Sequence, residues 1–246
     1  MNRRPMWCFV FAAVALSAAG CRTSHVRVEA PDKPIVINLN VKIDVRASRL
    51  FAGPHQYPPA EFAAYGILAF RSRPSAYDRP RYLFICEAYV SSLPHTSELD
   101  IAHTQQMATI WPTDSDANAD LLNRTPRKQI CEPAVDLYGL VTAQQALKDA
   151  ESAGADVAAG GPFLLAWSPS TDKGKQNALV LVSDLSDVTT YEQAKGVFTG
   201  WTRKIELNPE LWNKGWDIDQ LRAEIRYWVD KYGTKTLMLF GLAGGP

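Results

Sequence analysis

The residues with the clearest chemical potential lie in Ser183–Asp187 (sequence SDLSD), directly after the apolar run Ala178–Val182. Carboxylates that follow a buried strand are where α/β folds place ligand or metal groups, and oxygen ligands suit Mg²⁺ and Ca²⁺. Asp184, Ser186 and Asp187 therefore form a candidate divalent-metal site. A polar turn whose side chains cap the next helix explains the same residues more simply, and we favour that alternative.

Three further sets of residues have chemical potential, and each also has a simpler explanation. Imidazole and carboxylate groups along 95–116 are of the types that bind a divalent ion, but a solvated loop accounts for them. A serine nucleophile needs a positioned base, and none can be assigned. Two tryptophans that flank the turn 213–215 are candidates to contact a ligand or partner. The residues of these sets are His95, Glu98, Asp100, His103, Asp114, Asp116, Ser168, Trp212 and Trp216.

The sequence contains no common catalytic or nucleotide-binding motif. It has no Gly-x-Ser-x-Gly, His-Glu-x-x-His or Walker A pattern, and no Gly-x-Gly-x-x-Gly after a strand. The chain carries 26 basic and 26 acidic side chains, and without residues 1–20 the basic count falls to 24. This balance gives no electrostatic footprint for nucleic acid. We expect no nucleic-acid partner, and whether the chain is an enzyme stays open, with a non-enzymatic role favoured.

The elements that position these residues begin after a targeting segment. Residues 1–20 combine two arginines, an apolar run of about eleven residues and the small residues 17–20, the pattern of a cleaved signal peptide. The sequence before Cys21 resembles a bacterial lipobox, although Ala18 stands where Leu is usual. The resemblance implies cleavage before Cys21 and its modification with diacylglycerol and palmitate; an ordinary thiol after a secretory signal is the alternative. Residue 22 is Arg, so the Asp that usually retains a lipoprotein in the inner membrane is missing. This favours sorting to the outer membrane.

An alternating segment follows Cys21 after a short polar tether. From Ile35 to Val45 every odd position is apolar, and from Asn38 to Arg46 every even position is polar. A period of two residues predicts a strand with one apolar and one polar face. A single strand of this kind cannot bury its apolar face or satisfy its backbone alone. It therefore needs a partner, either in its own domain or in another protein.

The Pro-Asp-Lys-Pro-Ile entry at 31–35 and the Ile-Asn-Leu-Asn-Val-Lys-Ile strand at 37–43 resemble the YnbE-like outer-membrane lipoprotein family. The resemblance covers about residues 16–46. It implies a lipoprotein on the periplasmic face of the outer membrane, whose strand pairs with a large AsmA-like bridge protein in envelope lipid transport. Some 200 further residues depart from the family pattern and leave open whether the strand serves a partner or its own domain. The implied partner-binding residues are Ile35, Ile37, Asn38, Leu39, Asn40, Val41 and Ile43.

Two cysteines remain once the signal peptide and Cys21 are set aside. Cys86 and Cys131 lie in a chain expected to reach an oxidising compartment, where disulfides form. Their pairing would close a loop of about 45 residues and stabilise the fold by roughly 3–4 kcal/mol in the chain-entropy description. Two separate buried thiols are the alternative.

Strand and helix patterns alternate after the Pro-rich stretch 47–60, which reads as a linker. Short continuous apolar runs predict strands that are buried on both faces, and a period of 3.6 residues predicts helices. This alternation predicts an α/β layer fold with a mostly buried central sheet, whose strand order stays open. The expected strands are 65–70, 106–111, 163–167, 178–182 and 236–240; the expected helices are 82–93, 134–153, one opened by a capping box at Thr189–Glu192 and one capped by Asp217; residues 113–133 are expected to be loop.

These features divide the chain into a signal peptide at 1–20, a lipid-anchored tether and strand at 21–46, a linker at 47–60 and an α/β domain at 61–246. Two functions from different classes are compatible with them. The favoured one is a non-enzymatic lipoprotein, attached to the membrane through its lipid, that adds a strand to an AsmA-like partner. The alternative is a periplasmic enzyme or ligand- or metal-binding protein with its site at Ser183–Asp187.

Overall fold

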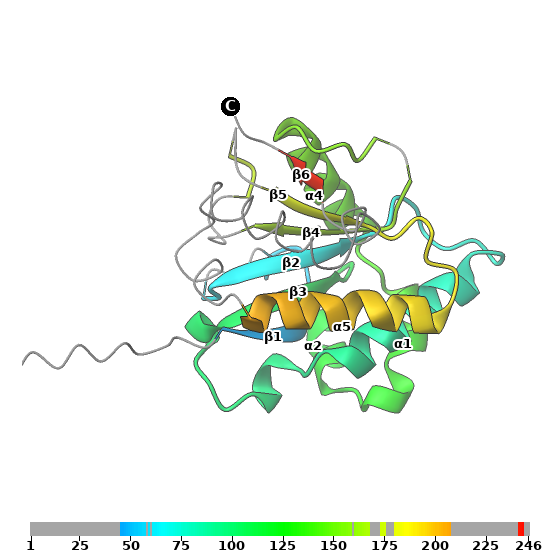
Figure 1. Cartoon of the computed structure of the whole chain (residues 1–246). Coiled ribbons are helices and arrows are strands. Elements are labelled where there is room, and N and C mark those ends of the chain that lie inside the picture. Colours follow the sequence, from blue (N-terminus) through cyan, green and yellow to red (C-terminus); the bar gives the residue numbers. More distant parts are fainter. Residues whose placement is uncertain are drawn as a thin grey trace, which may run out of the picture. The chain divides into compact units, whose positions relative to one another are not determined.

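The computed structural model describes residues 45–57, 59, 61–158, 160–167, 173–175, 180–207 and 241–243 of the chain. All of them belong to one compact unit, Lys42–Pro246. Helices in this unit pack against a mixed β-sheet (Figure 1). The expected α/β class is therefore confirmed for the described residues.

The sheet has six strands in the spatial order β1-β3-β2-β4-β5-β6. β1, β3 and β2 run parallel to one another, whereas β4, β5 and β6 each pair antiparallel with the strand before them in that order. The sheet thus changes from parallel to antiparallel pairing between β2 and β4. The strands are β1 Arg46–Ala52, β2 Ala64–Ala69, β3 Gln106–Pro112, β4 Phe163–Trp167, β5 Val180–Asp184 and β6 Gly241–Ala243.

Helices cover both faces of this sheet. α1 (Arg79–Ser92) and α5 (Tyr191–Leu207) lie against one face, where the Trp201 indole N–H donates to Thr109 Oγ1 at 3.0 Å. α4 (Leu140–Ser152) lies behind the opposite face in Figure 1 and contacts β2, β3 and β4. Every residue of these three strands is buried as a result. Their continuous apolar sequences predicted this burial.

Most predicted elements in the described part of the chain are confirmed, with boundaries shifted by a few residues. The capping box of α5 is displaced by one position, because Gln193 N–H donates to Thr190 Oγ1 at 3.3 Å and Thr190 N–H donates to Gln193 Oε1 at 3.2 Å. The helix expected from Asp217 and the strand expected at 236–240 lie outside the described residues. The confirmed predictions are the strands 65–70, 106–111, 163–167 and 178–182 and the helix 82–93.

The linker expected over 47–60 is wrong in its first part, because Arg46–Ala52 forms β1. Ser48 and Arg49 conceal this strand in the sequence, since both are polar side chains yet only 0% and 3% exposed. The prolines come later, in the segment that returns from β1 to β2. Tyr57 of that segment packs edge-on against Tyr65, with ring centroids 5.3 Å apart. The domain therefore includes β1 and the segment after it, and does not begin at residue 61.

The loop expected over 113–133 is also wrong, because it contains α2 (Asp116–Arg124) and the start of α3 (Cys131–Asp136). The helix expected at 134–153 is broken before α4. At this break Gly139 approaches the preceding strand so closely that a Cβ atom would lie 2.2 Å from Thr113 O. Tyr138 forms an isolated β-bridge with Thr113 at the same place. Helix composition alone did not indicate this close approach.

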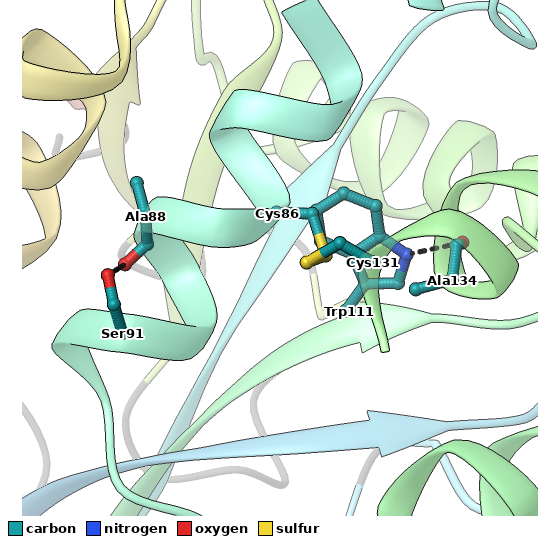
Figure 2. The surroundings of a disulfide bond; sticks show 6 residues. All are labelled: Cys86, Ala88, Ser91, Trp111, Cys131 and Ala134. Carbon is teal, nitrogen blue, oxygen red and sulfur yellow. Dashed lines mark hydrogen bonds between the residues drawn. A yellow bond between two sulfur atoms is a disulfide. The ribbon is translucent and has the colours of Figure 1, made fainter. Parts of the chain in front are cut away.

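A disulfide joins α1 to α3 (Figure 2). Cys86 and Cys131 have Cα atoms 5.6 Å apart and close a 45-residue separation. Beside the disulfide, the Trp111 indole N–H of β3 donates to Ala134 O of α3 at 3.0 Å. A helix of six residues is too short to be stable in isolation. α3 therefore depends on this bond to α1 and on its contact with the sheet.

Replacing both Cys86 and Cys131 with alanine should lower the free energy of unfolding by roughly 3–4 kcal/mol, because the unfolded chain loses its cross-link. Urea unfolding followed by circular dichroism measures this change. A reducing agent should lower the stability of the wild type by a similar amount and leave the double variant unaffected. A double variant that matches the oxidised wild type would contradict the role given to the disulfide.

Candidate functional site

The predicted lipidation site Cys21 and the partner-binding residues 35–43 lie outside the described part of the chain. The first described residues, Val45 and Arg46, lead directly into β1. Val45 is fully buried. The alternating segment is thus attached to an edge strand of the sheet without an intervening turn at 45–46.

The outer edge of β1 is capped over part of its length. Arg49 N–H donates to Pro94 O at 2.8 Å. The Asn123 side chain of α2 holds both backbone groups of Phe51: Oδ1 accepts from Phe51 N–H at 3.0 Å, and Nδ2 donates to Phe51 O at 2.8 Å. Unpaired backbone groups on an edge strand invite pairing with another chain. This capping closes the outer edge from Arg49 to Phe51.

His95 supports the capping asparagine. Its Nδ1 accepts from Ser97 N–H at 3.2 Å, which assigns the ring proton to Nε2, and Nε2 lies 3.1 Å from Asn123 Oδ1. Burial lowers the pKa of His95, and the charges of Arg49 and Arg127 lower it further, against the hydrogen bond to Asn123. The imidazole is therefore a neutral structural group at this edge.

On its inner side β1 pairs with β3, but this pairing does not extend beyond the amino end of β1. Arg46 pairs with Gln106, the first residue of β3. The residues before Gln106, His103–Gln105, form a short 3₁₀ turn. The β1–β3 register therefore offers no strand partner to residues that precede Arg46.

The histidines and carboxylates of 95–116 are not gathered into a cluster. Glu98 caps its own turn by accepting from His95 N–H at 3.0 Å, and it also pairs with Arg127. His103 Nδ1 lies 3.2 Å from Glu61 Oε2, and Asp116 Oδ2 lies 3.0 Å from His55 Nδ1. Within the described ranges, no three His, Cys, Asp or Glu side chains lie close enough to hold a metal ion.

The loop after β5 uses its polar groups internally. Asp184 Oδ1 accepts from Ser186 N–H at 2.8 Å and also from the Ser186 hydroxyl. Ser186 Oγ in turn accepts from Gly161 N–H at 2.6 Å. The loop thereby fastens the turn that precedes β4. The loop after β5 is thus a polar turn, which is the favoured alternative to the metal site. Its side chains bind the turn before β4, however, and do not cap α5.

A pocket of about 170 Å³ lies beside this loop, at the carboxyl end of β2. Open α/β sheets place ligands outside the carboxyl ends of their strands, and here the position is beside the boundary between the parallel and antiparallel parts of the sheet. Its lining comes from the end of β2, the start of α1 and the turn before β4. The lining residues are Phe70, Arg71, Ser72, Asp78, Arg81, Tyr82, Gly160, Gly161 and Pro162.

No known protein family, curated protein or solved structure matches this chain. None of the helices in the described residues is long and apolar enough to cross a membrane.

The remaining candidates are core residues or lie outside the described part. Trp111, Trp167 and Trp201 are 0–1% exposed and fill the core. Ser168, Trp212 and Trp216 are not among the described residues. The pocket arginines were not among the predicted site residues, although the four arginines between positions 71 and 81 are a visible signal in the sequence.

The depressed pKa of His95 makes the protein less stable in mild acid. The unfolded chain takes up the proton near pH 6.5, while the folded imidazole resists it, so the unfolded state binds more protons as the pH falls. His95→Gln should remove part of the loss of stability between pH 7 and pH 5. Urea unfolding at both values, with pH 8 as the reference where the imidazole is neutral in both states, measures it. Parallel curves for variant and wild type would contradict the assignment.

Proposed function

We propose that the chain is a non-enzymatic outer-membrane lipoprotein, attached through diacylglycerol and palmitate on Cys21, whose strand 35–43 pairs with an AsmA-like periplasmic partner in envelope lipid transport. The single observation that carries this proposal is the register at the start of β1. An amphipathic strand that continues into an edge strand needs a neighbouring strand. β3 begins opposite Arg46, so it provides no such neighbour for the residues before Arg46.

The geometry of β1 is compatible with strand addition by a partner. Arg49 and Phe51 are capped on the outer edge, so a pairing chain is restricted to the part of the strand before them. In such an addition the main-chain hydrogen bonds supply affinity, and alternate side chains supply specificity. The odd positions from Ile35 to Ile43 would place an apolar row against the partner's lining.

The disulfide supports the proposed compartment. Disulfides persist in oxidising surroundings such as the bacterial periplasm and are rare in the cytosol. The Cys86–Cys131 bond lies in the core, where Cys86 is fully buried and Cys131 is 8% exposed. An exported chain that carries a signal peptide and a lipobox-like sequence meets this requirement.

Cys21→Ala should abolish lipid attachment, because no thiol remains at the modified position. Metabolic labelling with a radioactive or clickable palmitate analogue should mark the wild type and leave the variant unlabelled. Cell fractionation should find the wild type in the outer membrane and the variant absent from it. Cys86→Ala is the matched control and should keep its label. Equal labelling of wild type and Cys21→Ala would disprove the anchor.

Photo-crosslinking probes at Asn38 and Asn40 should join the chain to one large periplasmic protein in intact cells. In the proposed strand these polar positions alternate with the apolar row, so a probe there leaves that row unaltered. A probe at the exposed Glu87 of α1 should give no such product. Products confined to the chain's own domain would rule out an external partner.

Asn40→Pro in the Asn38 probe background should remove the crosslinked product, because proline cannot donate to a β-ladder and restricts the backbone. Asn40→Ala keeps the backbone N–H and should retain the product. Both variants should show the same melting temperature, since residue 40 lies outside the compact unit Lys42–Pro246. Equal crosslinking in both variants would mean that no ladder forms at this position.

A further inference from the structure

Two guanidinium groups in the pocket are fixed in place by backbone carbonyl groups. Arg81 Nε donates to Val188 O at 3.1 Å, and Nη2 donates to Leu185 O and Ser186 O at 2.8 Å each. Nη1 is the nitrogen for which the described residues provide no partner. A guanidinium held on two nitrogens loses little conformational freedom when its third nitrogen binds a ligand.

Arg71 approaches the pocket from the end of β2. Its Nε donates to Gly160 O at 3.1 Å, and its guanidinium carbon lies 5.6 Å from the centre of the Phe163 ring. Both of its Nη atoms have no partner among the described residues. Arg81 Nη2 also lies 3.5 Å from Gly161 O. Both arginines therefore contact the turn 160–162, and together they present three nitrogens for further hydrogen bonds.

The turn itself can be built only with small residues. Gly160 and Gly161 have φ angles of +80° and +97°, a region that side chains disfavour. A Cβ on Gly160 would lie 2.5 Å from Ser186 Oγ. The hydrogen bond from Gly161 to Ser186 keeps this wall of the pocket in position.

The amide groups at the start of α1 are already used. Arg79 N–H donates to Ser75 O at 2.9 Å, and the N–H groups of Arg81 and Tyr82 donate to Asp78 O at 2.9 and 3.2 Å. These amides are therefore not free to bind an anion, and the arginine side chains are the cationic donors of the pocket lining. Asp78 also lines the pocket, with its carboxylate accepting from Ser75 Oγ at 2.8 Å. Two arginines against one carboxylate leave the lining with a net positive charge.

We propose that this pocket binds a phosphate group through Arg71 and Arg81. Forked guanidinium donors match the oxygens of phosphate, and the pocket's 170 Å³ corresponds to about five or six liquid water volumes. This space suits inorganic phosphate or the phosphate of a small headgroup. The carboxylate of Asp78 can accept a hydrogen bond from a hydroxyl of the bound group. The site is independent of strand pairing by residues 35–43.

Calorimetric titration of the full-length protein in a non-ionic detergent, at constant ionic strength, tests the proposal. Inorganic phosphate should bind the wild type, and Arg71→Gln should weaken binding at least tenfold. Arg71→Lys should give an intermediate affinity, because it keeps the charge and loses the fork. Arg73→Gln is the matched control: it removes an exposed arginine of the same loop that does not line the pocket, and should bind as the wild type does.

A second titration identifies the source of the phosphate. Glycerophosphoglycerol, the water-soluble headgroup of phosphatidylglycerol, binds more tightly than inorganic phosphate if the natural ligand is a lipid headgroup, and more weakly if it is a free anion. Either order supports the pocket. The proposal is overturned if neither compound binds the wild type, if acetate binds and phosphate does not, or if Arg71→Gln and Arg73→Gln weaken binding equally. None of these outcomes bears on the crosslinking of residues 38 and 40.

Discussion

Burial of the central strands on both faces is the constraint on which the rest of this fold depends. Backbone groups of such strands have no water to bind and need partners from the protein. Two tyrosine hydroxyls meet this need. Tyr138 Oη accepts from Phe70 N–H at 2.8 Å and donates to Leu68 O at 2.9 Å, and Tyr89 Oη lies 2.8 Å from Thr109 O. These contacts fix α1 and the turn before α4 relative to the sheet.

The same constraint has a different solution at the edge of the sheet. β1 carries a buried arginine, Arg49, whose Nε and Nη1 have no hydrogen-bond partner in the described structure, and whose Nη2 is 3.9 Å from Glu98. A buried charge of this kind costs stability, and burial lowers the pKa of Arg49. Asn123 and His95 close the outer edge beside it. An edge strand with this much polar structure leaves only its amino end for pairing, which is where the alternating segment joins it.

The sequence predicted the buried strands and the amphipathic helices, because continuous apolar runs and a 3.6-residue period report burial directly. β1 was missed because Ser48 and Arg49 are polar residues in buried positions. α2 was missed although it has a local signal, the N-cap Ser115 followed by Asp116. α3 was missed because its stability comes from tertiary contacts, including the Cys86–Cys131 bond. The pocket was missed for a related reason. Its walls come from three separate parts of the chain, and no spacing within one of them records their meeting.

The loop after β5, a candidate site in the sequence, lies beside the pocket. Carboxylate and hydroxyl groups at the end of a buried strand made this loop a candidate ligand site, with a polar turn as the favoured alternative. Asp184 binds Ser186, and Ser186 binds the Gly161 amide. Their effect on a ligand is thus indirect, through the positions of Gly161 and Arg81. Because β1 and β2 both run parallel to β3, the pocket at the carboxyl end of β2 and the amino end of β1 lie at opposite ends of the sheet, about 20 Å apart at 3.3 Å per residue. The proposed phosphate site is therefore well separated from the only part of β1 whose outer edge is not capped.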